Sequence, residues 1–265
     1  MKSIKIVLFS LITLFLFASP FLNAADKLTG KDISVLMDKA NSSTGTVTKG
    51  VLELKDLKSG SVEKRTYITI SGLEQGLKRM LFKFIDSSYK GTAFLTVENK
   101  GGSKVQYVYL SSMGSPRQVE ASDKESNFLD TDVTNEDLGG GNSGDYTYER
   151  LEDKTVDGMD CYHIERIPVN KKSKFSKYSV IIDKKSLLAV QVKAYSKDNR
   201  LVKTIKADEI KKVREGLYVP ARLTVTNIPD KHETGIKILD VKEKAVNAGY
   251  FNKNRMGKTL EEEKL

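Results

Sequence analysis

The feature that most restricts the fold of this chain is a long succession of short β-patterned runs with turn residues between them. Most runs begin roughly 8–15 residues apart, a spacing typical of consecutive antiparallel neighbours. Helical periodicity is rare and no strand–helix–strand rhythm is present, which favours one strongly curved antiparallel sheet, or half-open β-barrel. The expected strands are residues 47–55, 64–71, 80–85, 92–98, 104–110, 146–151, 161–168, 178–183, 187–196, 201–210, 218–227 and 235–241.

One clear amphipathic helix precedes the strands. Thr29 and Asp32 have the spacing of a capping box at its start, and residues 41–43 end it. A curved sheet needs cover on its concave face, so we expect this helix to act as a lid. Its apolar stripe, at positions i, i+3, i+4 and i+7, consists of Ile33, Leu36, Met37 and Ala40.

The first 24 residues are typical of a secretory signal peptide. Lys2 and Lys5 precede the apolar run 6–18, Pro20 breaks it, and residues 22–24 form an acceptable cleavage signal. The run is shorter than the roughly 20 residues of a membrane-spanning helix, although an uncleaved anchor is an alternative. No cysteine follows the run, which argues against a lipidated N-terminus. Export of a protein with a single thiol predicts a periplasmic location.

Cleavage would leave residues 25–265 as the working protein and lower the net charge from +9 to +7. A chain of this length forms one β-rich domain or two small ones. No linker rich in proline or serine divides it. The glycine-rich stretch 139–144 has strand patterns on both sides and is interpreted as a loop within one domain, and a second helical stretch is indicated within 111–138.

The scarcity of reactive residues argues against several kinds of chemistry. One cysteine and two histidines exclude an internal disulfide, a multi-thiolate site and a three-histidine metal centre, so we expect no metal and no cofactor. Cys161 and His163 face the same side of a predicted strand, which leaves a thiolate–imidazole dyad as one hypothesis. Two ordinary strand residues are the favoured interpretation. The glycines 139–144 lack the ending of a phosphate-binding loop.

The charge pattern predicts no nucleic-acid partner. The chain has 44 basic and 35 acidic residues, but the two signs are interspersed and no recognition motif or basic arm is present. A solvated surface explains this pattern best, and attraction to anionic membrane surfaces is the alternative.

The remaining signal is apolar, because aromatic and aliphatic side chains crowd three neighbouring predicted strands. Such a cluster is either ordinary core or the lining of a cavity for an apolar ligand. Its members are Phe82, Phe84, Phe94, Leu95, Tyr107 and Tyr109.

Several short motifs follow one another in a recognisable order. They include Phe82–Ile85, Lys90–Leu95, Tyr107–Leu110, Asn135–Leu138 and, further on, residues 145–148, 158–162, 177–179 and 201–203. In order and spacing they resemble the LolA-like outer membrane lipoprotein-sorting protein family over residues 30–256. The chain departs from the family pattern at Gln106, where the family prefers tryptophan, at Ser111, where it has proline, and in the stretch 127–132.

The resemblance implies a half-open antiparallel barrel covered by helices, with an apolar cavity for acyl chains. It implies a periplasmic, monomeric carrier of lipoprotein or lipid, with an inner-membrane transporter and an outer-membrane acceptor as partners, and no catalysis. A sensor of envelope lipoprotein stress and an accessory subunit of a lipid-exporting transporter are the alternatives. In the family an arginine on a strand latches the lid, and Arg65 and Arg79 lie near that position without matching it.

Overall fold

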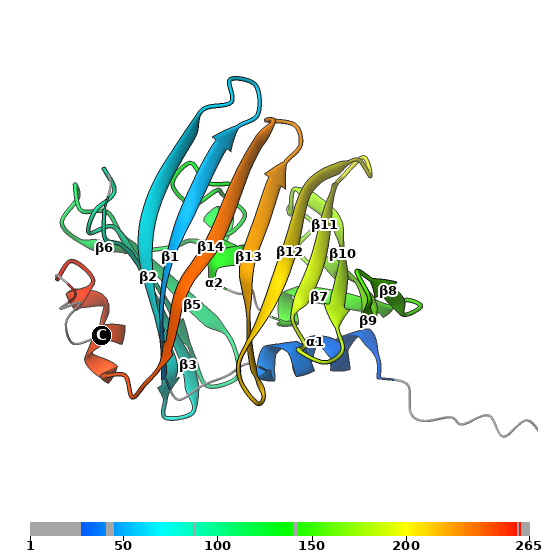
Figure 1. Ribbon diagram of the computed structural model, residues 1–265, viewed down its shortest axis with the longest axis horizontal. Helices are drawn as coiled ribbons and strands as arrows, with labels where there is room; N and C mark the ends of the chain where they lie inside the picture. The colour runs from blue at the N-terminus through cyan, green and yellow to red at the C-terminus, as the bar shows by residue number, and fades with distance from the viewer. Residues whose placement is uncertain (1–27, 41–44, 87, 140–142, 259, 261–265) are drawn as a thin grey trace, which may run out of the picture.

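A curved antiparallel sheet dominates the computed structural model, which describes residues 28–40, 45–86, 88–139, 143–258 and 260 (Figure 1). The 14-stranded sheet has the order β6-β5-β4-β3-β2-β1-β14-β13-β12-β11-β10-β9-β7, with β8 paired to β9. The sheet curls strongly but does not close into a barrel, as the strand pattern predicts. We call the concave side, which carries the two α-helices, the inner face, and the opposite side the outer face.

Each of the expected strands is present. The two that the sequence analysis missed, β6 (Pro116–Gln118) and β8 (Lys154–Val156), have three residues each, too few for a visible alternation. The others are β1 (Gly45–Asp56), β2 (Val62–Glu74), β3 (Leu77–Phe84), β4 (Ala93–Glu98), β5 (Lys104–Tyr109), β7 (Tyr146–Arg150), β9 (Met159–Pro168), β10 (Phe175–Asp183), β11 (Ala189–Ser196), β12 (Leu201–Arg214), β13 (Leu217–Asn227) and β14 (His232–Glu243).

The strand order places the first strand, β1, beside the last strand, β14, in the middle of the sheet. Val51 of β1 is opposite Thr66 of β2 on one side and Lys237 of β14 on the other. Consecutive strands are otherwise mostly neighbours, as expected, but the chain leaves the sheet between β6 and β7. Gly50 has no room for a side chain at this junction, because a Cβ atom would lie 2.4 Å from the Tyr67 hydroxyl.

Helix α1 (Gly30–Lys39) forms where its sequence predicts. The Thr29 hydroxyl accepts from the Asp32 amide at 3.2 Å, and the Asp32 carboxylate accepts from the Thr29 amide at 2.9 Å, which completes the capping box. Ile33 is fully buried, and it packs with Met37 against an inner-face cluster that contains Ile164 and Tyr178. The helix therefore covers the half of the inner face formed by β7 and β9–β11.

A second cover crosses the other half of the inner face. Residues 119–139, which we call the inner segment, contain the short helices η1 (Ala121–Asp123) and α2 (Asn135–Gly139). Helix α2 lies within the curve of the sheet (Figure 1). The sequence indicates a helix within 111–138, but most of this region follows an irregular path stabilised by side chains.

A third cover lies on the outer face of β1–β5. Residues 245–258 and 260, with the short helices η3 (Ala248–Phe251) and η4 (Lys253–Arg255), form this C-terminal segment. Phe251, Met256 and Leu260 pack against the outer-face side chains of Ile70 and Leu81. The remaining 3-10 turn, η2 (Ser143–Asp145), directly precedes β7.

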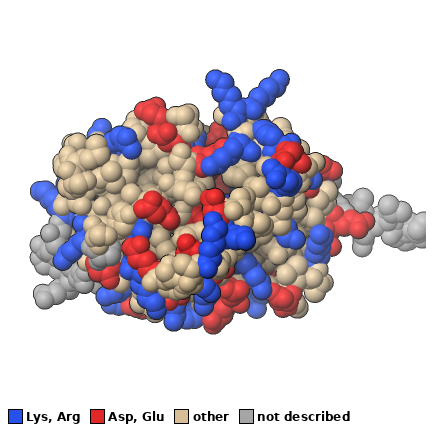
Figure 2. Space-filling model, turned by 90° about the horizontal axis from the view of Figure 1, so that it is seen from above, with Lys and Arg blue, Asp and Glu red and all other residues tan. Residues whose placement is uncertain are grey.

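The surface carries both signs of charge. Viewed from the end of the sheet where the β1–β2 and β13–β14 hairpins turn, basic and acidic side chains alternate without a continuous patch of one sign (Figure 2). An ion pair joins Lys64 to Glu53 at 3.0 Å, and the Arg222 side chain lies between Glu53 and Asp208. This distribution is typical of a solvated surface.

Candidate functional site

The inner face of β2–β4 carries an aromatic cluster with a plug. Phe82, Phe84 and Phe94 are nearly or fully buried, and the ring of Phe128 from the inner segment lies among them. Its centroid is 5.8 Å from that of Phe82, 6.1 Å from Phe84 and 5.4 Å from Phe94, within the range of favourable aromatic pairs. Half of the predicted cavity residues thus meet at one place, and a side chain of the protein fills the space between them.

The other predicted cavity residues, Leu95, Tyr107 and Tyr109, lie on the outer face. Successive side chains of a strand alternate between faces, and the register places Leu95 opposite Tyr107 and Ala93 opposite Tyr109. They pack beneath the C-terminal segment, where a Cβ atom on Gly257 would lie 2.5 Å from the Tyr109 hydroxyl. The six residues therefore do not form one lining, which corrects the sequence-based expectation.

Polar contacts hold the inner segment to the sheet. The Arg65 guanidinium, 1% exposed, donates from Nη1 to the Leu129 carbonyl at 2.6 Å. The buried Asp132 carboxylate lies 2.7 Å from His232 Nδ1 and accepts from the Thr234 hydroxyl at 2.8 Å. Sequence reasoning missed Asp132, His232 and Thr234, because nothing local links residues about a hundred positions apart.

Arg65 and Arg79 occupy different environments. Arg65 contacts the inner segment, whereas Arg79 pairs with Glu74 at 2.9 Å and donates to the Glu98 carbonyl at 2.6 Å. Of the two candidates, Arg65 is therefore the one that joins a strand to a cover of the inner face.

Helix α2, at the end of the inner segment, contacts strands β7 and β12 in the other half of the sheet. Lys203 of β12 forms an ion pair with Asp137, and the Tyr146 hydroxyl donates to Glu136. Burial alone would raise the pKa of Asp137, but the Lys203 ammonium and the hydrogen bonds from Lys203 and Thr134 hold that pKa below its usual range. Burial raises the pKa of Glu136, opposed by the Tyr146 hydrogen bond. The segment thus spans both halves of the inner face.

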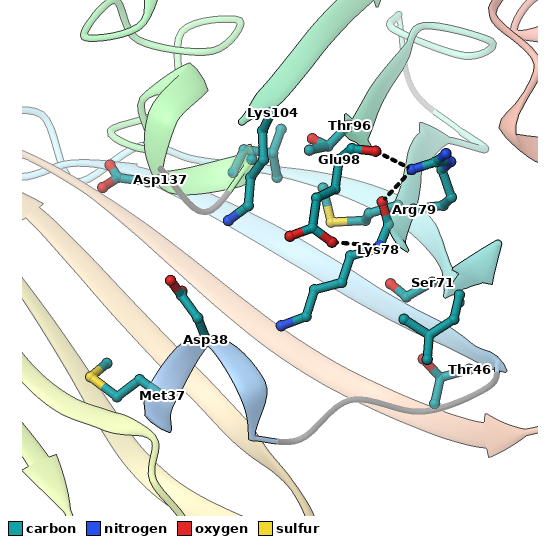
Figure 3. Close-up of a pocket in the computed structure, with 15 residues that line it drawn as sticks. Met37, Asp38, Thr46, Ser71, Lys78, Arg79, Thr96, Glu98, Lys104 and Asp137 are labelled. Atoms are coloured by element: carbon teal, nitrogen blue, oxygen red, sulfur yellow. Dashed lines mark hydrogen bonds between the residues drawn. The ribbon is translucent and has the colours of Figure 1, made fainter. Parts of the chain in front are cut away.

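An open pocket lies between α1, α2 and the ends of β1–β5 (Figure 3). Its volume is about 320 Å³. Met37, Leu73, Met80 and Leu138 supply its apolar surface, and Met80 and Leu138 also pack against the aromatic cluster. The pocket therefore ends where the plugged cluster begins. Its polar lining residues are Asp38, Thr46, Ser71, Lys78, Arg79, Thr96, Glu98, Lys104 and Asp137.

The four residues of the predicted lid stripe differ in their burial and in their contacts. Ile33 and Met37 pack against the sheet, and Met37 also lines the pocket. Leu36 and Ala40 are half-buried. The helix is seated closely on β7, because a Cβ atom on Gly30 would lie 3.0 Å from the Glu149 carbonyl carbon.

Cys161 and His163 lie on the outer face, and each has a different partner. The Cys161 thiol contacts the Met159 carbonyl at 3.4 Å, and His163 Nε2 lies 2.8 Å from the Ser179 hydroxyl. Burial raises the pKa of the Cys161 thiol and lowers that of His163, which disfavours the thiolate–imidazolium pair that a nucleophilic dyad needs. Among the described residues, no three His, Cys, Asp or Glu side chains are grouped to hold a metal ion.

Solved structures with the same fold include three bacterial proteins. An outer membrane lipoprotein-sorting protein domain from Vibrio parahaemolyticus is 22% identical, with a TM-score of 0.78 over 86% of this chain and 98% of that one. A DUF1329 family protein from Desulfovibrio piger is 24% identical, with a TM-score of 0.76 over 86% and 97%. A LolA superfamily protein from Nitrosomonas europaea is 18% identical, with a TM-score of 0.64 over 86% and 99%.

Sequence comparison adds a family match. No curated protein matches the chain. Within the described residues, no helix has the length and apolar character needed to cross a bilayer. A family model described as an uncharacterized protein matches residues 76–258, more than half of the sequence. The chain therefore belongs to the family that this model describes, and its fold is that of the LolA-like lipoprotein-sorting proteins.

Proposed function

We propose that this protein is a periplasmic carrier that binds acyl chains of a lipoprotein or lipid on its inner face and moves them toward the outer membrane. One observation carries the proposal. The aromatic cluster of the inner face is closed by the inner segment, which inserts Phe128 into it and is held to the sheet by polar contacts of Arg65 and Thr234, and an open pocket reaches the edge of the cluster. Displacing the Phe128 plug would extend that pocket into an apolar cavity.

Physical chemistry explains why such a cavity serves transport. Burying one methylene group is worth about 0.8 kcal/mol, so a long acyl chain does not leave a membrane for water at a useful rate. A carrier also needs a state that expels the chain. Here Phe128 occupies the position that an acyl chain would take. In the closed form its ring would therefore compete with the acyl chain for the aromatic cluster and favour release of the chain.

The proposal includes a location and partners. Cleavage of residues 1–24 would release the protein into the periplasm, where an inner-membrane transporter would supply the cargo and an outer-membrane acceptor would receive it. No catalytic step is required, in keeping with the raised pKa of the Cys161 thiol. The fold of the lipoprotein-sorting domain from Vibrio parahaemolyticus supports this assignment.

Lipid retention tests the proposal directly. We expect native mass spectrometry of the protein purified from the periplasm, followed by lipid extraction, to detect bound acyl lipid. Phe84→Ser should reduce that lipid about tenfold or more, because it places a hydroxyl in the aromatic cluster. Leu239→Ser is the matched control, since Leu239 is 51% exposed.

Circular dichroism would establish that both variants fold. A wild-type protein that carries no lipid, and binds no fluorescent fatty acid in titration, would refute the carrier. Deletion of the gene separates the carrier from a sensor. A carrier's loss depletes lipid or lipoprotein in the outer membrane, whereas a sensor's loss first alters a stress response.

A further inference from the structure

One threonine hydroxyl on the inner face is buried without a hydrogen-bond partner. In the part of the chain that the structure describes, three buried side-chain nitrogen or oxygen atoms lack one: Thr96 Oγ1, Arg150 Nε and Arg166 Nε. Both guanidinium groups lie 5.0 Å from the centroids of tyrosine rings, which attract a cation. Thr96 differs from them, because its side chain lines the open pocket (Figure 3). An unpartnered hydroxyl beside a pocket indicates a ligand that would supply the partner.

Thr96 lies between the pocket and the aromatic cluster. The register of β3–β5 places it in one cross-strand row with Met80 and Gln106, and the next row holds Phe82 and Phe94. Side chains on the same face are two residues apart along a strand, so the rows follow each other at about 7 Å. An acyl chain that extends from the pocket into the aromatic cluster therefore passes Thr96.

The inner segment covers this hydroxyl in the closed form, the state in which Phe128 fills the aromatic cluster. Thr96 is 6% exposed, and a Cβ atom on Gly139 would lie 3.2 Å from its hydroxyl oxygen. The closed form thus takes a donor away from water and gives it no acceptor, which lowers the stability of this form. Displacement of the inner segment would uncover Thr96 and the aromatic cluster together.

The surroundings of Thr96 favour an uncharged acceptor. The hydroxyl is one neutral donor, and its row neighbours Met80 and Gln106 carry no charge. A phosphate or carboxylate taken into this row would leave most of its oxygens unpaired, at a high cost in free energy. An ester carbonyl needs only one donor, and in a fatty acyl ester it stands at the head of the chain.

We propose that Thr96 binds the carbonyl oxygen of a fatty acyl ester and thereby favours the loaded form, in which cargo takes the place of Phe128. In the loaded form the Thr96 hydroxyl donates to this carbonyl, and the acyl chain extends toward Phe82 and Phe94. In the closed form the same hydroxyl has no partner, so its hydrogen bond contributes only to the loaded form. The inference rests on the proposed function and adds the chemical class of the cargo and a residue that recognises it.

The test compares two neutral lipids with the same chain and the same glycerol headgroup. Monoacylglycerol has an ester carbonyl, and its alkyl ether analogue has none. Displacement of a fluorescent fatty acid from the delipidated mature protein gives the affinity of each lipid below its micelle concentration. Because the two lipids differ in their own tendency to leave water, the quantity to follow is the ratio of the ester affinity to the ether affinity.

Variants assign this ratio to one hydroxyl. Thr96→Val keeps the shape of the side chain and should lower the ratio about fivefold, the effect of one neutral hydrogen bond. It should weaken ester binding and leave ether binding unchanged. Thr96→Ser keeps the hydroxyl and should keep the ratio. Thr204→Val is the matched control, since Thr204 adjoins Lys203, which contacts the inner segment, and so faces the outer side of β12.

Thermal denaturation of the delipidated protein adds a readout with the opposite sign. Thr96→Val removes an unpartnered hydroxyl from the closed form and should raise the melting temperature. A threonine whose hydroxyl made a structural hydrogen bond would instead lose stability on this substitution. Higher stability without lipid, together with weaker ester binding, is the combination that the proposal requires. A lower melting temperature would show that the hydroxyl is satisfied in the closed form and would overturn the proposal.

The outcomes separate the two proposals. If neither lipid binds the wild-type protein, the carrier function itself fails. If both lipids bind and Thr96→Val leaves the ratio of affinities unchanged, the carrier function stands and the carbonyl site at Thr96 is overturned. A change in Thr204→Val as large as that in Thr96→Val overturns it as well.

Discussion

Single buried polar residues fasten the covers of this sheet. Lys83 is the clearest example on the outer face, where it is 4% exposed. Its ammonium group donates to the Met256 carbonyl at 2.7 Å and to the Lys258 carbonyl at 2.6 Å. Sequence alternation places Lys83 opposite the Phe82–Phe84 face, but only the C-terminal segment explains why a lysine is buried there.

Lys83 should make stability depend on pH. Burial lowers its pKa from 10.5 to about 8 in the folded protein. Between these values the unfolded chain holds a proton that the folded chain has released, so the free energy of unfolding should rise with pH. Urea denaturation of wild type and Lys83→Met from pH 7 to 10 measures this. The free energy of unfolding of the wild type should rise steadily above pH 8 relative to that of Lys83→Met. A difference in this free energy that does not change with pH would contradict the prediction.

Gly139 offers a sharper test at one position. A Cβ atom there would lie 1.6 Å from Gln106 Nε2, which donates to the Asn135 carbonyl at 2.9 Å. Gly139→Ala should therefore break this bond and destabilise the protein by about 1–3 kcal/mol in urea denaturation. Gly144→Ala is the control, because a Cβ atom on Gly144 meets nothing within 4 Å. Equal effects of the two substitutions would argue against the contact.

At the scale of elements, the inner segment differs from the other two covers in the strain of its backbone. Leu129 and Asp130 have φ angles of 47° and 61°, a left-handed conformation that costs a non-glycine residue about 1–2 kcal/mol. Arg65 and Thr234 hold the strained turn against the sheet. A segment with this balance of strain and anchors suits a removable plug.

Removing the plug side chain should therefore open the site. Phe128→Ala should increase the affinity for a fluorescent fatty acid several-fold, while truncating a buried phenylalanine lowers stability by about 3–5 kcal/mol. Phe251→Ala truncates the same residue type on the outer face and should destabilise without increasing affinity. Fluorescence titration beside thermal denaturation measures both effects. A gain of affinity in Phe251→Ala, or no gain of affinity in Phe128→Ala, would show that Phe128 does not block the binding site.

Most helices and strands could be predicted from the sequence, but which cover lies over which part of the sheet could not. Alternation and turn residues placed every longer strand, and the capping box of Thr29 and Asp32 placed α1, because these signals are local. The expected lid α1 covers only the half of the inner face around Tyr178. The half around Phe84 is covered by an irregular segment with little periodicity.

At the scale of the whole molecule, one continuous sheet is covered in three places. The pairing of β1 with β14 brings the first and last strands together, and the C-terminal segment then folds back over β1–β5. The edge strand β6 is three residues long and begins with Pro116, which limits pairing with another chain.

Truncation after Lys244 should test the outer cover. It would expose the cluster around Ile70, Leu81 and Leu95 and lose the burial of Phe251 and Met256, roughly 5 kcal/mol in total. We expect a lower melting temperature and self-association in sedimentation velocity. Truncation after Leu260 removes only the last residues and should leave both unchanged. A shortened chain that stays monomeric and equally stable would show that the cover is dispensable.

Local patterns in the sequence decided where the strands and α1 lie, and the order of short motifs decided the family resemblance. They also decided that neighbours such as Phe94 and Leu95 face opposite sides, because side chains of a strand alternate. Only the tertiary structure decided which side is inner, since the covers that distinguish the two faces come from distant parts of the chain. The same holds for the pairs of Asp132 with His232 and of Asp137 with Lys203, which exist only because the sheet curls and returns the chain to meet itself.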